Sequence, residues 1–329
     1  MGFVKTGIDE QEKLFRPIDL EFLKVGGTEF FDIFYKTITF GNTQFVKFAS
    51  SHPSHQDKIR KLIQSGEINE EFYIREEDLI KYHSLATKSL RTMISDPEIP
   101  FQEKTQKIYD VSKGIMKEFF DNNASDKMLQ TSEEVMNIME QCLSENEAGF
   151  HSLTMITSKD YYTYTHSVNV GLYCMSYGIK TKMGSNDTKE LGLGGMLHDV
   201  GKSKIDASLI NKKGKLTDEE FQTIKSHSSF GKEILESMQC YGPNVVRMAA
   251  EHHEKFKGNG YPNGLVGEEI SNFARICKVM DVYDALTTRR SYKKAMAPFE
   301  ALTIMAKQMV DEFDFNILKN FVHYMGPDL

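Results

Sequence analysis

The chain has 329 residues, of which 40% are hydrophobic and 26% are charged. This composition predicts a folded protein with a substantial core and excludes a disordered chain, and the length fits one large domain or two ordinary ones. The net charge of −7 argues against a general nucleic-acid binder, so an anion site has to be local.

Targeting signals are missing from the sequence pattern. No run of about eighteen apolar residues occurs, so we expect no membrane span, and residues 1–15 lack the apolar centre of a signal peptide. The four cysteines are scattered without a CxxC pair, which is typical of small buried side chains in a reducing compartment. We therefore expect a cytoplasmic protein.

The first hundred residues predict a small α/β module. Residues 29–49 alternate aromatic and polar positions around Gly41-Asn42, which indicates a β-hairpin. Residues 55–66 indicate a short helix that ends at a glycine, and residues 70–86 indicate a strand that leads into a helix. No group of residues suited to catalysis lies here.

Residues from about 101 to 147 predict two helices with a break over 121–126. Apolar side chains recur at helical spacing on one face of each. A connector, a dimerisation stalk and core helices are equally compatible with this pattern. We expect the N-terminal module, with its helical connector from about residue 101, to cover residues 1–150, and a second domain to cover residues 151–329.

Helix signals dominate the second domain. Thr217 and Glu220 fit a capping box, which predicts the start of a helix, and we expect this helix to continue past His227. Pro243 suits the first turn of another helix, which runs to a double histidine. Ser271 predicts the N-terminal cap of a third helix.

Five of the ten histidines stand out, because each lies near the end of a predicted helix or on its apolar face. They are His166, His198, His227, His252 and His253. The other five fit surface or packing positions: His52, His55, His83, His151 and His323.

Three aspartates accompany the first group of histidines. Asp199 directly follows His198, and Asp281 and Asp284 are three residues apart, which places them on one helix face. Imidazole and carboxylate are ligands of borderline divalent ions, whereas structural zinc sites depend on cysteine. Burying so many such groups without a metal would cost several kcal/mol in unpaired polar atoms. The joint pattern therefore predicts a metal site.

Longer motifs surround these residues, among them "DYYTYTHSVNV", "LHDVGKSKID", "EHHEKFKGNGYPNGL" and "ARICKVMDVYDALTTRRSYKKAM". Through them, residues 161–321 resemble the HD-GYP domains, a branch of the HD superfamily of metal-dependent phosphohydrolases. The resemblance implies a mainly α protein, with an all-helical HD-GYP catalytic domain over 151–329 behind a smaller N-terminal α/β module. It implies that this N-terminal module is regulatory or serves interactions, as in the small modules often placed before HD-GYP domains. It also implies that the chain is a metal-dependent phosphodiesterase that hydrolyses cyclic di-GMP.

The resemblance further implies two divalent metal ions, iron first and manganese as the alternative. Asp199 would bridge them, and a bridging hydroxide would attack one phosphodiester in line with its 3′ oxygen. The product would be linear pGpG, with GMP as the alternative end product. The implied ligands are His166, His198, Asp199 and Asp281 for one ion, and Asp199, His227, His252 and His253 for the other.

Substrate contacts are also carried over from the family. Lys202 would take part in catalysis by touching the scissile phosphate or the bridging carboxylate. Arg290 and Lys293 match a phosphate grip, for which the planar fork of arginine is suited, although a basic surface turn is the alternative. Asp284 would orient a ligand or the lysine. Tyr261 would stack on a guanine or pack on the fold.

Three positions depart from the family pattern, and one of them is Asp206, where many members carry Pro. Tyr162 stands where members with a third metal carry Glu, so we expect two ions. Lys257 replaces an acidic residue of the signature loop, also called the GYP loop, which carries Gly260-Tyr261-Pro262. It would hold substrate phosphate, mark reduced turnover or be an ordinary surface residue. The alternative function is therefore a low-activity or inactive HD-GYP protein that acts as a cyclic di-GMP receptor or a protein-interaction scaffold.

Besides cyclic di-GMP, the implied partners are signalling proteins bound through the GYP loop or the N-terminal module. Neither nucleic-acid binding nor membrane insertion is expected. A different HD-superfamily phosphohydrolase that acts on mononucleotides fits the GYP loop and the double histidine less well.

Overall fold

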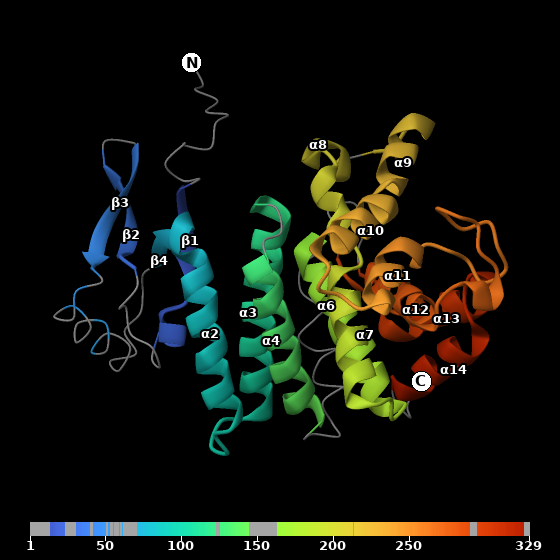
Figure 1. The fold of residues 1–329 in the computed structure, drawn as a ribbon, viewed down its shortest axis with the longest axis horizontal. Coiled ribbons are helices and arrows are strands. Elements are labelled where there is room, and N and C mark those ends of the chain that lie inside the picture. Colours follow the sequence, from blue (N-terminus) through green and yellow to red (C-terminus); the bar gives the residue numbers. More distant parts are fainter. Residues whose placement is uncertain are drawn as a thin grey trace. The chain divides into compact units, whose positions relative to one another are not determined.

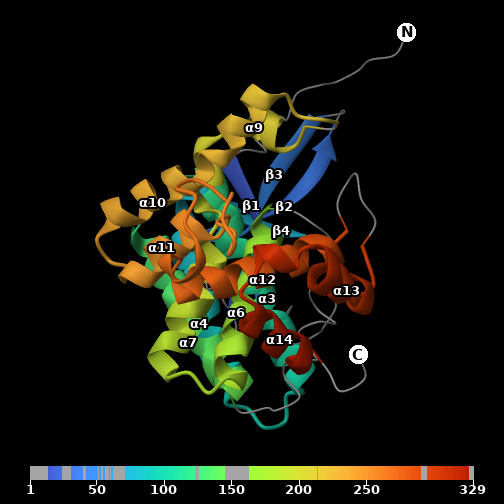
Figure 2. The same ribbon diagram turned by 90° about the vertical axis from the view of Figure 1, so that its right-hand side faces the viewer.

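The computed structural model divides the chain into two compact units, residues 1–100 and 101–329. Figures 1 and 2 show their elements in two views. The structure describes residues 14–23, 31–39, 42–50, 52, 55, 59, 61, 71–122, 126–144, 163–212, 214–289 and 295–325. Among these residues, no helix is both long and apolar enough to cross a membrane.

The first unit contains a four-stranded antiparallel sheet in the order β1-β4-β2-β3. The predicted hairpin is confirmed, because β2 and β3 pair antiparallel up to Thr39 opposite Asn42. The predicted strand-to-helix segment is confirmed as β4 followed by α2. The elements are β1 (Phe15–Ile18), 3-10 helix η2 (Leu20–Leu23), β2 (Ile33–Thr39), β3 (Asn42–Ala49), β4 (Phe72–Arg75), 3-10 helix η3 (Glu76–Asp78) and α2 (Leu79–Ile94).

Most of the helix predicted over residues 55–66 lies outside the described residues. The three positions that are described there, 55, 59 and 61, are helical.

The helices predicted between residues 101 and 147 are α3 (Phe101–Asn122) and α4 (Asp126–Ser144). They lie within the second compact unit, which begins at Phe101. Helix α3 contacts α4 and α6 (Thr163–Lys180), and its apolar residues Ile108 and Ile115 are buried. Of the three readings left open, core helices of the second unit are the one that the packing favours.

The remaining elements of the second unit are helical, in agreement with the predicted mainly α fold. They are α7 (Ser185–Leu197), η4 (Val200–Lys204), α8 (Ala207–Ile210), α9 (Asp218–Lys225), α10 (His227–Met238), α11 (Pro243–Glu251), η5 (Gly267–Glu269), α12 (Asn272–Thr287), α13 (Pro298–Gln308), η6 (Val310–Glu312) and α14 (Phe315–Tyr324).

The predicted helix starts are confirmed, but one predicted continuation is wrong. Thr217 and Glu220 form a capping box, yet α9 ends at Lys225 and α10 begins at His227. The side chain of Ser226 donates to the carbonyl oxygen of Thr223, and His227 Nδ1 contacts the carbonyl oxygen of Ile224. Because these side chains use carbonyls of the preceding turn, the two helices are separate, and the break places an imidazole at the start of α10.

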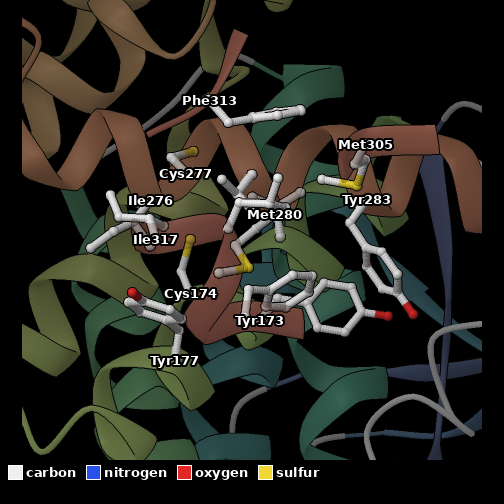
Figure 3. Packing of buried hydrophobic residues seen from close by; sticks show 14 of the residues in the cluster. Tyr173, Cys174, Tyr177, Ile276, Cys277, Met280, Tyr283, Met305, Phe313 and Ile317 are labelled. Atoms are coloured by element: carbon white, nitrogen blue, oxygen red, sulfur yellow. The ribbon is translucent and has the colours of Figure 1, made fainter. Parts of the chain in front are cut away.

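The core of the second unit packs α6 against α12, α13 and α14 (Figure 3). Tyr173 of α6 meets Tyr283 of α12 edge to face, with ring centroids 5.4 Å apart, and Phe321 of α14 meets Tyr283 in the same way at 5.1 Å. This core fixes the two helices that carry His166 and Asp281. Three cysteines are buried as expected, whereas Cys240 is exposed.

Candidate metal centre

Five separate segments supply the histidines and aspartates singled out from the sequence. Helix α6 carries His166, and α12 carries Asp281 and Asp284. A histidine and the residue after it follow the end of α7 and, likewise, the end of α11. The fifth segment is the start of α10, whose first residue is a histidine. The residues from these last three segments are His198, Asp199, His227, His252 and His253.

Asp199 lies between two groups of imidazoles. Its atoms form one close group with His166 and His198, and another with His227, His252 and His253, with the potential ligand atoms of each group within 4.8 Å of one another. The Asp199 carboxylate is 3.4 Å from His198 Nε2 through Oδ2 and 3.4 Å from His227 Nε2 through Oδ1. The two oxygens therefore face opposite groups.

Asp281 lies next to the first of these groups. Its Oδ1 atom is 3.1 Å from His166 Nε2, and the same Nε2 atom is 3.8 Å from Asp199 Oδ2. The structure thus brings together all seven residues that the sequence predicted as ligands.

Backbone carbonyls orient three of the imidazoles. His198 Nδ1 is 2.6 Å from the carbonyl oxygen of Gly195, and His227 Nδ1 is 2.7 Å from that of Ile224. His252 Nδ1 is 3.1 Å from two carbonyl oxygens of α11. A carbonyl oxygen only accepts, so each Nδ1 donates and each neutral ring keeps its Nε2 lone pair toward the centre.

Burial sets the protonation of these groups. It lowers the pKa of His198, His227 and His252, because the charged imidazolium is disfavoured away from water. Burial alone would raise the pKa of Asp199, but Lys202 and the surrounding imidazoles hold it well below its usual range. Neutral imidazoles around ionised carboxylates are the forms that bind metal ions.

Two buried atoms of the centre lack a hydrogen-bond partner in the described part of the chain. These are His198 Nε2 and Asp199 Oδ1. Buried polar atoms without a partner are rare and costly. These two atoms belong to opposite groups, so one divalent cation in each group would satisfy them. The nitrogen and oxygen donor set suits such ions, so the residues present fit the implied metals.

Lys202 and Asp284 contact members of the centre. Lys202 Nζ is 2.5 Å from Asp199 Oδ2, so of its two expected contacts the structure contains the one to the carboxylate. Asp284 Oδ2 is 2.7 Å from His166 Nδ1. It therefore contacts a predicted ligand rather than the lysine.

The signature loop packs against the double histidine. The Tyr261 ring stacks on His253 with centroids 4.7 Å apart and an interplanar angle of 24°, so it packs on the fold. A side chain at Gly260 would come within 2.4 Å of the backbone of Glu254, and that close approach requires glycine.

Glu254 is a residue that the sequence reasoning missed. Its buried carboxylate accepts backbone N–H groups from Asn263 and Gly264 at Oε1, at 2.7 and 3.1 Å, and from Leu265 at Oε2, at 3.1 Å. The only sequence signal for this role is an acidic residue directly after the double histidine, and that signal gives no hint of partners nine to eleven residues further on.

Three predicted positions lie outside the described residues: Tyr162, Arg290 and Lys293. Lys257 is described. Its ammonium group pairs with Asp311, and both side chains are mostly exposed. Among the histidines expected elsewhere, His52, His55 and His323 are exposed and His83 is buried, while position 151 is not described.

The family assignment follows from a profile described as HD domain, which matches residues 122–317. The match covers more than half of the chain, and the chain belongs to the HD domain family.

Curated relatives agree with the resemblance to HD-GYP proteins. The chain is 38% identical over 175 residues to the cyclic di-GMP phosphodiesterase PA4108 of Pseudomonas aeruginosa, an alignment that covers 53% of this chain and 42% of that protein. It is 33% identical over 177 residues to 3′3′-cGAMP-specific phosphodiesterase 3 of Vibrio cholerae, covering 53% and 38%. The chain thus aligns with about two fifths of the length of these relatives.

A solved structure shares the fold. It is described as Bd1817, a HDG"Y"P protein from Bdellovibrio bacteriovorus, and matches with a TM-score of 0.66 over 93% of this chain and 98% of that chain. Its sequence identity of 16% limits the comparison to the fold.

Proposed function

We propose that the second unit is a phosphodiesterase that hydrolyses cyclic di-GMP at a centre of two divalent metal ions. The observation that carries this proposal is the position of Asp199 between two groups of imidazoles, with one carboxylate oxygen toward each. The activity for which the Pseudomonas relative is named supports cyclic di-GMP as the substrate.

The predicted ligands would divide into two sets that share Asp199. Two bound ions would supply an activated water and positive charge for the phosphoryl oxygens. Iron is the first expectation and manganese the alternative, because a mixed imidazole and carboxylate site accepts several such ions. The first set is His166, His198, Asp199 and Asp281. The second set is Asp199, His227, His252 and His253.

Side chains around the ligands would hold the centre and the substrate. Lys202 would keep the shared carboxylate of Asp199 ionised and fixed, since its ammonium group contacts Oδ2. Arg290 and Lys293 would grip the phosphate, as the family pattern implies. In the reaction, the oxygen of water bonds to phosphorus, the bond from phosphorus to the 3′ oxygen breaks, and that oxygen takes a proton, giving pGpG. A second hydrolysis would give GMP.

A direct assay can distinguish the proposal from two alternatives, another cyclic dinucleotide substrate and a receptor or scaffold role. One relative is named for 3′3′-cGAMP, a cyclic dinucleotide with the same two phosphodiesters. The departure at Lys257 motivates a receptor or scaffold with little turnover. We place the protein in the cytoplasm, with cyclic di-GMP and signalling proteins as its partners.

The test compares the wild-type chain with Asp199→Ala and Asp187→Ala after anaerobic purification. Asp187 is an exposed aspartate at the start of α7, the helix that ends before His198, and serves as the matched control. Metal content is measured by elemental analysis. Turnover of cyclic di-GMP, 3′3′-cGAMP and a mononucleotide is measured with added Mn²⁺ or Fe²⁺.

We expect two ions per chain and pGpG formation for the wild type and Asp187→Ala, and loss of both for Asp199→Ala. Retained turnover in metal-loaded Asp199→Ala would contradict the proposed centre. Tight binding of cyclic di-GMP by a loaded wild type that does not cleave it would favour the receptor.

A further inference from the structure

A chain of buried hydrogen bonds extends from the candidate centre to helix α3. The Tyr109 hydroxyl is 2.8 Å from Asn169 Oδ1, and Asn169 Nδ2 is 2.8 Å from Asp284 Oδ1. Asp284 Oδ2 is in turn 2.7 Å from Nδ1 of His166. Tyr109 thus lies two side chains away from a proposed metal ligand, although 57 positions separate it from that ligand in the sequence, the difference between 166 and 109.

The carboxylate at the centre of this chain fixes the direction of every bond. A carboxylate only accepts, so the amide nitrogen of Asn169 has to face Asp284, and its carbonyl oxygen faces Tyr109. Tyr109 therefore has to donate. For the same reason His166 donates from Nδ1, which leaves the Nε2 lone pair facing Asp199 and Asp281.

Every member of the chain is shielded from solvent. Tyr109 is 5% exposed, and Asn169 and Asp284 are fully buried. Thr288, also buried, donates its hydroxyl to Asp284 Oδ1 at 2.9 Å. A lost hydrogen bond here is not replaced by bulk water, so removing one donor alters the support of Asp284.

We propose that Tyr109 is a positioning residue for the metal centre, which acts through Asn169 and Asp284 on the orientation and basicity of His166. Carboxylate partners of metal-bound histidines fix the ring and its tautomer, and their loss typically weakens metal binding about 10- to 100-fold. The proposal rests on the proposed metal centre, and it makes α3 part of that centre.

Tyr109 lies on helix α3, so the proposal connects this helix to the metal centre. Tyr109 precedes the residues 122–317 that match the HD domain family. Helix α3 also contacts η4, the 3-10 helix that carries Lys202. A displacement of α3 would therefore reach both His166 and the residues that follow Asp199.

The experiment measures metal affinity in Tyr109→Phe, a change that removes one hydroxyl and keeps the ring. Tyr177→Phe is the matched control, because Tyr177 is another buried tyrosine of the second unit, on α6, with its ring centroid 6.1 Å from that of Tyr324 of α14. Mn²⁺ affinity is measured by competition with a chelator, and the thermal stability of the metal-free protein is measured in parallel. No cyclic nucleotide is present.

We expect Tyr109→Phe to weaken one of two Mn²⁺ sites about ten-fold, and Tyr177→Phe to keep the wild-type Mn²⁺ affinity. Without metal, the two variants should have the same thermal stability as each other, because each loses one buried hydroxyl. A double-mutant cycle with Asp284→Asn tests the route. If Tyr109 acts through Asp284, Tyr109→Phe has no further effect in the Asp284→Asn background.

Equal Mn²⁺ affinity in Tyr109→Phe and wild type would overturn the inference, and so would a wild-type chain that binds no divalent ion. Additive effects of the two substitutions would overturn the route through Asp284. A wild type that binds two ions but does not cleave cyclic di-GMP would refute the proposed substrate, whereas a loss of affinity in Tyr109→Phe would still support this inference.

Discussion

Replacing Glu254 by Gln tests how the signature loop is held. The carboxylate of Glu254 accepts three backbone N–H groups, from Asn263, Gly264 and Leu265. A glutamine has the same shape but only one accepting oxygen. If that oxygen keeps Asn263 and Gly264, the new amide group faces the N–H of Leu265, so two donors meet.

The expected cost follows from these contacts. An unsatisfied buried N–H costs about 1–3 kcal/mol, and the other two bonds lose part of the strength that the charge gave them. Together the loop should lose about 2–4 kcal/mol of local stability. Since 1.4 kcal/mol corresponds to a factor of ten, amide hydrogen exchange of Asn263, Gly264 and Leu265 should accelerate about 30- to 700-fold.

The assay is hydrogen–deuterium exchange followed by mass spectrometry or NMR. Glu269→Gln is the control, because Glu269 is an exposed glutamate of the same loop that accepts a single backbone N–H, from Val266. Exchange at positions 263–265 should stay near the wild-type rate in this control. Equal exchange at Leu265 in Glu254→Gln and wild type would refute the reasoning, because the loop would then be held by other contacts.

Three further predictions concern charge. Arg290→Ala should weaken binding of cyclic di-GMP by about ten- to a hundred-fold, the worth of a charge-assisted contact, and leave metal content unchanged; unchanged calorimetric binding would make Arg290 a surface residue. Lys257→Asp should leave kcat for cyclic di-GMP unchanged, because the exposed ammonium group already pairs with Asp311 and exposed pairs contribute about 0–1 kcal/mol; a clear rise in kcat would support the receptor alternative. Burial lowers the pKa of His83 to about 4. Between about pH 6.5 and 4 this imidazole is therefore protonated in the unfolded chain and neutral in the folded chain. Folding stability should therefore fall by about 3 kcal/mol as the pH drops through that window, and in urea titrations His83→Leu should lack this component; identical pH slopes for both proteins would contradict it.

The sequence by itself determined the features that depend on neighbouring residues. The capping box at Thr217 and the cap at Ser271 were predictable because each uses a partner three residues away. The antiparallel pairing of β2 and β3, predicted as a hairpin around Gly41-Asn42, was predictable because alternation and turn residues are local signals. The seven ligand candidates were found for a related reason, since their motifs are short and chemically distinctive.

Only the tertiary structure decided which distant groups meet. The sequence left open whether the helices after residue 100 form a connector, a stalk or a core, and packing places α3 against α6. That contact gives Tyr109 its partner Asn169, 60 residues away. The three N–H groups on Glu254 likewise depend on how the loop folds back. Such partners have no fixed sequence spacing, because the buried core, rather than the local chain, brings their hydrogen-bonding atoms within reach.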